Sequence, residues 1–194
     1  IIGSADKKAV QYPKKALLLW SADTQAVAKA MQGELPVVLL AHEAKAEVYP
    51  LMTTAVKLED ALEEGAILTK EYITTEKLQM LALGSPEQYQ LTEQMEALLE
   101  LEGIEFLQKL DDHVITAMTG AVLQAAACKV PVMLDGIAAC LAAIAAGKLA
   151  PVSLEYCMAG HVSAEPGMEK LLNWLQMSAP LRLAINSGAG EGAV

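Results

Sequence analysis

The sequence predicts an α/β fold: a three-layer, Rossmann-like parallel sheet flanked by helices, with a small helical appendage. The clearest strand is the apolar run 130–134, which ends directly in Asp135 and Gly136. A short, continuously apolar run with β-branched residues is typical of a parallel strand that is buried on both faces. The segment 137–146 that follows is small and apolar on nearly every side, which indicates a helix that is covered all round.

The other elements are expected along the chain without a clean domain boundary, so we treat 1–194 as a single domain. No internal repeat or low-complexity linker separates them. Strands or strand-like pieces are expected at 16–20, 37–41, 47–49, 77–84, 152–158 and 181–185. Helices are expected at 24–32, 58–72, 86–101 and 166–175, and an exit loop at 159–167.

Composition excludes several classes of function. A formal net charge of -10 argues against a nucleic-acid partner. No window reaches the ~18 apolar residues of a membrane span and no signal peptide opens the chain, so the sequence predicts a cytoplasmic protein without a membrane partner. The three cysteines and three histidines show no metal-ligand spacing, so no metal is predicted. A phosphorylated small molecule is compatible, because glycine-rich loops and helix N-termini bind anions without net positive charge.

Polar side chains follow two consecutive predicted strands. Asp135 ends the first strand, and the loop after the second carries His161, Ser163 and Glu165 between glycines. In open α/β sheets the ligand crevice lies outside the carboxyl ends of the strands, so we expect the functional site at this edge. The alternative is structural: Asp135 and Ser163 would cap the helices that follow them, and His161 would pack within its loop.

Two motifs in this stretch resemble a known family. The segment PVMLDG at 131–136 and the segment AGHVSAEPG at 159–167 are similar to motifs of the nicotinate-nucleotide:dimethylbenzimidazole phosphoribosyltransferases. The resemblance covers residues 58–194 well and the first 57 poorly. It implies transfer of phosphoribose from nicotinate mononucleotide to an aromatic base, benzimidazole or phenolic. The product would be an α-ribotide for cobamide biosynthesis, and no cofactor would be needed.

The resemblance also implies roles for single residues. Glu191, between Gly190 and Gly192, matches the family's catalytic glutamate, which takes the proton from the incoming base. A carboxylate whose pKa is raised by burial suits that task. We expect Glu191 to emerge beside Asp135 and the turn 160–167 along one rim of the sheet, so that the three line a shared hollow. A second register aligns 181–183 with the family's LRLGEG segment and puts Ile185 at the catalytic position, which would make the chain inert. The substrate-binding positions implied by the resemblance are Asp135, Gly160, Ser163, Ser85, Asp23 and Thr24.

Three junctions depart from the family pattern. Near 23/24, 51/52 and 85/86 the family has longer active-site segments, and its loop GEMGIGNTT is absent after Gly84. Either the chain is a shortened paralogue, or mobile segments are missing from the sequence. The alternative function is therefore a non-catalytic subunit that pairs with an active paralogue.

A homodimer or a heterodimer with such a paralogue is expected from exposed apolar surface. The helix 137–147 and the leucines and tryptophan of 171–175 offer more apolar surface than one small domain covers.

Overall fold

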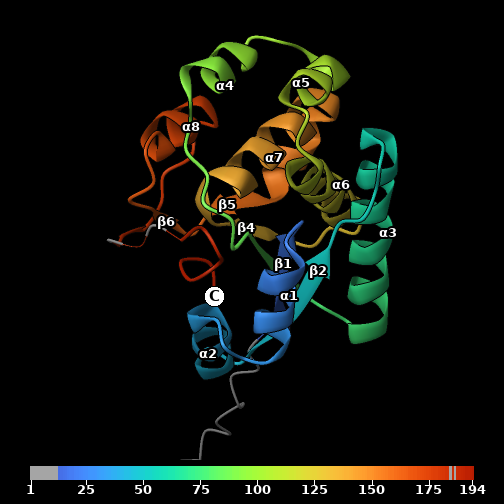
Figure 1. Cartoon of the computed structure of the whole chain (residues 1–194), viewed down its shortest axis with the longest axis vertical. Helices are drawn as coiled ribbons and strands as arrows, with labels where there is room; N and C mark the ends of the chain where they lie inside the picture. The colour runs from blue at the N-terminus through green and yellow to red at the C-terminus, as the bar shows by residue number, and fades with distance from the viewer. Residues whose placement is uncertain (1–12, 184, 186) are drawn as a thin grey trace, which may run out of the picture.

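The centre of the computed structural model, which describes residues 13–183, 185 and 187–194, is a five-stranded parallel sheet (Figure 1). The strands lie in the order β2 (Ala46–Met52), β1 (Lys15–Ser21), β3 (Met80–Gly84), β4 (Val132–Leu134) and β5 (Cys157–Ala159). Every neighbouring pair is parallel. This confirms the predicted α/β class. The chain order reverses between β1 and β3, which is the topological switch point of such sheets.

One face of the sheet is covered by three long helices. They are α3 (Leu58–Glu76), α6 (His113–Ala127) and α7 (Gly136–Leu149). Leu18 and Trp20 of β1 and Leu83 of β3 belong to the same buried cluster as residues of these helices. The expected helix at 137–146 is confirmed, because α7 buries every residue from Gly136 to Ala146. Burying apolar surface of this extent is the main favourable term in folding.

The other face of the sheet has a thinner cover. It consists of α1 (Thr24–Met31), α2 (Pro36–Glu43) and the last residues of the chain. Leu17 and Leu19 of β1 pack here with Ala30, Val37 and Ala189. Figure 1 shows the C-terminal end close to α2, on the side of the sheet away from α3.

Short elements complete the chain. They are α4 (Glu93–Leu98), α5 (Gly103–Leu110), the 3-10 helix η1 (Pro151–Tyr156), α8 (Met168–Trp174) and a separate parallel pair, β6 (His161–Val162) with β7 (Leu181–Arg182). Lys148 of α7 joins several of them: its Nζ donates to Leu99 O at 2.7 Å and lies 4.9 Å from the centre of the Trp174 ring. Within the described ranges, no helix combines the length and apolarity that a membrane crossing needs.

Two predicted strands are wrong. Residues 37–41 lie in α2, because Pro36 occupies the first helical turn, where its missing N–H costs nothing. Most of the predicted strand 152–158 is η1, which Pro151 begins in the same way, with Ser153 N donating to Ala150 O at 2.8 Å. The strand β5, which pairs with β4, is limited to residues 157–159.

The predicted helix 86–101 is too long, because contacts from elsewhere hold its first part in an irregular conformation. Ser21 Oγ and Ser85 Oγ both donate to the Glu87 carboxylate, and Leu91 N donates to Pro166 O at 3.0 Å. The helix α4 begins only at Glu93, after Thr92 caps it by accepting from Met95 N.

The apolar surface expected to form a dimer is largely covered by the chain itself. All residues from Ile137 to Ala146 are at most 2% exposed, and Leu171, Leu172 and Leu175 are buried. Of the predicted set, Trp174 is the residue with substantial exposure, at 38%. A homodimer or heterodimer stays a prediction, but most of the apolar surface on which it was based is buried within the chain. The segments expected to be missing at 23/24, 51/52 and 85/86 likewise stay a prediction.

Candidate active site at the carboxyl edge of the sheet

The strand register brings three strand exits side by side. Leu134 of β4 lies opposite Leu83 of β3 and Ala159 of β5. The next residues, Gly84, Asp135 and Gly160, therefore share one edge of the sheet. Asp135 N donates to Leu83 O and Gly160 N to Leu134 O, both at 3.1 Å. This is the edge at which a ligand crevice is expected in an open α/β sheet.

The last residues of the chain, 187–194, cross these three strand exits. A glycine at each exit allows the crossing, because a Cβ atom added there would lie 2.5, 2.6 or 2.2 Å from the backbone of the crossing loop. Contacts that short leave no room for a side chain. The glycines are Gly84, Gly136 and Gly160. Ser85 N also donates to Gly188 O at 2.9 Å.

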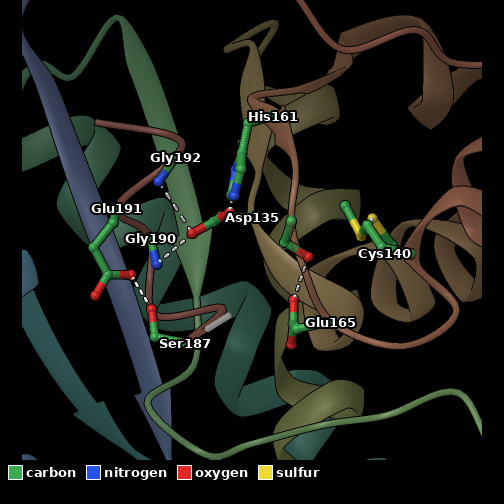
Figure 2. A network of polar contacts seen from close by, with 10 residues as sticks. Asp135, Cys140, His161, Glu165, Ser187, Gly190, Glu191 and Gly192 are labelled. Carbon is green, nitrogen blue, oxygen red and sulfur yellow. Dashed lines mark hydrogen bonds and ion pairs between the residues drawn. The ribbon is translucent and has the colours of Figure 1, made fainter. Parts of the chain in front are cut away.

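Asp135 connects this loop to β4 from a fully buried position. Its Oδ2 accepts from Gly190 N at 2.7 Å and from Gly192 N at 3.3 Å. Its Oδ1 lies 2.9 Å from His161 Nδ1, as an ion pair that lacks the geometry of an aligned hydrogen bond. Figure 2 shows Asp135 at the centre of these contacts. The Asp135 side chain makes no capping bond to α7, so the alternative prediction that it caps this helix is wrong.

His161 is buried against the same loop. A Cβ atom on Gly192 would lie 1.7 Å from His161 Nδ1, so the ring occupies the space that any side chain at that position would need. Contact with the Asp135 carboxylate raises the pKa of His161, while burial opposes the shift. The His161 ring and two amide donors surround the buried Asp135 carboxylate, whose charge alone would be costly to bury.

Glu165 forms a second buried acidic position beside the first. Its Oε2 accepts from Ser163 Oγ at 2.8 Å, so Ser163 does not cap α8, whose N-cap is Gly167. Burial raises the pKa of Glu165, and the nearby Asp135 charge adds to the shift. Glu165 lines two cavities, one of about 430 Å³ with Ser163, Lys170 and Arg182, and one of about 470 Å³ with Gln88, Tyr89 and Pro166.

Glu191 lies on the crossing loop, but its side chain turns away from Asp135. Ser187 Oγ donates to Glu191 Oε2 at 2.5 Å. Figure 2 shows the Glu191 side chain on the opposite side of the loop from the amides that bind Asp135. The loop backbone thus shares the edge with Asp135 and Gly160, as the sequence predicts. The half-buried Glu191 carboxylate, however, lines neither of the two cavities described above.

The position named by the second register lies nearby. Ile185 O accepts from Ala164 N at 2.8 Å, so Ile185 borders the loop 160–167. Its neighbours at 184 and 186 lie outside the described residues. Both registers therefore assign the catalytic position to the segment that crosses the strand exits or leads into them.

A second polar cluster sits at the β1/β3 switch point. Glu87 Oε1 accepts from Ser21 Oγ at 2.7 Å and from Ala22 N at 2.8 Å, and Ser85 Oγ donates to Glu87 Oε2. Asp23 caps α1 by accepting from Gln25 N at 2.8 Å, and Thr24 is the exposed first residue of that helix. The predicted positions Ser85, Asp23 and Thr24 are thus neighbours, while Asp135, Gly160 and Ser163 form a separate group.

One residue of these clusters, Glu87, was missed by the sequence analysis. His161 and Glu165 were expected at this edge of the sheet, but no substrate-binding role was assigned to them. Glu87 gave a weak signal, as the first charged residue after a buried strand. It follows Ser85 and Pro86, which favour a turn that brings a side chain back over the strand end.

Comparisons with known proteins agree with the motifs. A family model described as "Phosphoribosyltransferase" matches residues 51–194. Nicotinate-nucleotide–dimethylbenzimidazole phosphoribosyltransferases of Rhodobacter capsulatus and Ruminiclostridium cellulolyticum are 42% and 43% identical over 93 and 90 residues. These matches cover 48% and 46% of this chain but 28% and 26% of the relatives' own length.

A solved structure of such an enzyme is also similar. The nicotinate-nucleotide–dimethylbenzimidazole phosphoribosyltransferase of Thermus thermophilus superposes with a TM-score of 0.76 and 21% sequence identity. The superposition covers 94% of this chain and 78% of that one. At this level of identity the likeness shows a shared fold.

Proposed function

We propose a transferase function from one premise: the chain belongs to the nicotinate-nucleotide:dimethylbenzimidazole phosphoribosyltransferase family. The proposed reaction moves phosphoribose from nicotinate mononucleotide to an aromatic base, benzimidazole or phenolic, to give an α-ribotide for cobamide synthesis in the cytoplasm. The observation that carries the proposal is the extent of the family match. Residues 51–194 include Asp135, the loop 160–167 and the crossing loop that bears Glu191.

The chemistry of the reaction fits the groups at this edge. An azole nitrogen or phenol oxygen of the base attacks C1′ of nicotinate mononucleotide, and the bond from C1′ to nicotinate breaks. The electron pair of that bond neutralises the positive charge on the departing ring nitrogen, so nicotinate leaves without being protonated. The incoming base loses a proton, and we assign its acceptance to Glu191, whose carboxylate has to leave Ser187 and turn toward the substrate to accept it. Positioning and electrostatics can supply the remaining acceleration, so the proposal includes no metal or redox cofactor.

The phosphoribosyl group is assigned to the cavity beside Ser163. Ser163, which lines this cavity, and Gly160, which lies outside its lining, are proposed to contact the ribose and phosphate. Lys170 and Arg182 supply positive charge to a lining that also holds Glu165 and Glu169. Both cations form exposed ion pairs with Glu96 and Glu169. Such pairs are worth ~0–1 kcal/mol, so an incoming phosphate can replace them. We propose that Ser85, Asp23 and Thr24 contact the more distant part of the substrates.

One observation favours the alternative, a non-catalytic subunit that pairs with an active paralogue. At the switch point, the hydroxyls of Ser21 and Ser85 already donate to Glu87. A substrate that used Ser85 would have to displace this carboxylate. In this alternative the site is completed by the partner, and the chain contributes stability rather than chemistry.

The experiment that separates the two functions uses the isolated chain. The purified protein is incubated with nicotinate mononucleotide and either dimethylbenzimidazole or p-cresol, and the products are separated by chromatography and identified by mass. We expect an α-ribotide and free nicotinate. A folded chain that releases neither would contradict the transferase proposal and support the subunit role.

A matched pair of variants tests the catalytic assignment. Glu191→Gln removes the proton acceptor and keeps the size of the side chain, so we expect product formation to fall by at least about 100-fold. Glu105→Gln makes the same change on the exposed surface of α5 and should leave the rate unchanged. Wild-type activity in Glu191→Gln would refute the assignment.

A further inference from the structure

We propose that Asp135, held in place by His161, is the positioning residue of the loop that carries Glu191. Asp135 does not reach the reacting atoms in this proposal; it fixes the backbone from which Glu191 projects. The inference rests on the proposed function, because positioning matters for transfer only if Glu191 takes part in it.

The first support is the symmetry of the contacts about Glu191. One carboxylate oxygen, Asp135 Oδ2, accepts from the N–H groups of both Gly190 and Gly192, the residues on either side of Glu191. The turn is closed on itself as well, since Ala193 N donates to Gly190 O at 3.0 Å. With the flanking amides turned toward Asp135, the Glu191 side chain must leave from the other side of the loop, as Figure 2 shows.

The second support is the requirement for glycine on both sides. Gly190 has φ +110°, a conformation that side chains rarely adopt. Gly192 lies against the His161 ring so closely that a methyl group would overlap Nδ1. The ring that pairs with Asp135 is therefore also the wall on which the loop rests. Any shift of His161 would change both the carboxylate and the loop.

The third support is electrostatic. Asp135 is fully buried, so its charge depends on His161 and on the two loop amides for compensation. Were the loop to lift away, the carboxylate would lose two charge-assisted hydrogen bonds inside the protein, where they cannot be replaced by bulk water. This penalty holds the loop on the strand exits. Hydrogen bonds of this kind lock a functional side chain more firmly than a glycine-rich loop could by itself.

The test compares two substitutions at Asp135 with a control. Asp135→Leu has a similar size but no acceptor, and it should release the loop. Displacing a catalytic group by ~1 Å can cost on the order of 100-fold, so we expect kcat to fall by about that factor while KM for nicotinate mononucleotide changes by less than about threefold. Asp135→Asn keeps one carbonyl acceptor and should restore kcat to within about tenfold of the wild type.

The matched control is Asp112→Leu. Asp112 accepts a backbone N–H from Ile115 at 2.8 Å, as Asp135 accepts from Gly190, but it caps α6. We expect it to lower the melting temperature without changing the kcat of the folded protein. Equal loss of kcat in Asp112→Leu and Asp135→Leu, or wild-type kcat in Asp135→Leu, would overturn the positioning role.

A second readout does not depend on activity. Hydrogen exchange of the Gly190 and Gly192 amides, followed by NMR, should be at least about tenfold faster in Asp135→Leu than in the wild type. If Asp135→Leu does not fold, His161→Gln serves in its place and should speed the same two amides. If the wild type is inactive, the transferase proposal fails. The exchange rates of the Gly190 and Gly192 amides still test whether Asp135 holds the loop in place. Unchanged exchange in the folded variant would overturn the inference even if activity were lost.

Discussion

The two polar clusters at the carboxyl edge of the sheet differ in how their hydrogen bonds are satisfied. At the β1/β3 switch point, Glu87 binds Ser21 and Ser85, and all three are near the ends of adjacent strands. At the β4 and β5 exits, Asp135 binds amides 55 and 57 residues further along the chain. The first cluster closes on itself, whereas the second holds a glycine-rich loop beside two cavities. We therefore place the proposed chemistry at β4 and β5 rather than at the switch point.

The largest effect that we expect comes from Gly192→Ala at the β4/β5 exits. The added methyl would overlap the buried His161 ring. Overpacking of this kind costs about 1–3 kcal/mol of unfolding free energy, which urea denaturation measures.

Gly33→Ala is the matched control for that change. Gly33 has a positive φ of +76°, which Gly192 does not share, and nothing lies within 4 Å of an added Cβ atom. The cost should therefore be limited to backbone strain, about 1 kcal/mol. An equal loss of unfolding free energy in Gly192→Ala and Gly33→Ala would mean that the contact with His161 does not determine the cost of the added methyl group.

A smaller effect is expected from Glu87→Gln at the switch point. The change removes a negative charge and weakens the hold on Ser85, so the phosphate-bearing substrate should bind slightly better. We expect KM for nicotinate mononucleotide to fall by about two- to fivefold, equivalent to ~0.5–1 kcal/mol, with kcat unchanged. A fall of kcat as large as in Asp135→Leu would remove the distinction between the two clusters.

The pH dependence of stability should also separate the clusters. The folded-state pKa values of His161 and Glu165 are both raised. A raised folded pKa contributes stability that is fully present below the unfolded pKa and is lost as the pH rises through the folded pKa. For His161, which faces Asp135 and Glu165, this loss begins above a pH of about 6.5.

The measurement is the unfolding free energy at about pH 6 and pH 9 in the wild type and in His161→Gln. We expect the wild type to lose stability over this interval and His161→Gln to lose less, because it lacks the titrating imidazole. The Glu87→Gln variant should lose the same unfolding free energy over this pH interval as the wild type. An equal loss of unfolding free energy in His161→Gln would show that His161 does not titrate in this range.

The smallest effect on stability is expected from Lys170→Ala. The ion pair of Lys170 with Glu96 is exposed, so its loss should change the unfolding free energy by less than ~0.5 kcal/mol. If the phosphate enters the cavity beside Ser163, KM for nicotinate mononucleotide should nevertheless rise about three- to tenfold. An unchanged KM would move the phosphate away from this cavity.

The sequence predicts much of the sheet because its strands are apolar on both faces. The runs at 16–20, 77–84 and 130–134 all mark real strands, and the small apolar helix after Gly136 is fully buried. Prolines at 36 and 151 begin helical turns in segments whose β-branched residues favour strands. The length of α4 depends on contacts from Ser21 and Pro166, which no local pattern contains.

The sequence predicts at which edge of the sheet the candidate site lies, but it does not predict which atoms are in contact there. The rule that parallel strands end together is enough to bring Asp135 and the loop 160–167 into one place. It does not tell which oxygen of Asp135 binds which amide, nor that His161 rests on Gly192, because those depend on the path of the crossing loop. The direction of the Glu191 side chain follows from the same path: it turns away from Asp135, whereas the sequence analysis expects the two to line a shared hollow.

The most direct test of the account is a titration of the isotope-labelled chain with nicotinate mononucleotide, followed by the NMR shifts of backbone amides. The account predicts that the largest shifts occur at Gly160, Ser163 and the loop 188–192, with smaller ones at Asp23, Thr24 and Ser85. Large shifts confined to residues 21–24 and 85–87, with none in the loop 160–167, would contradict it.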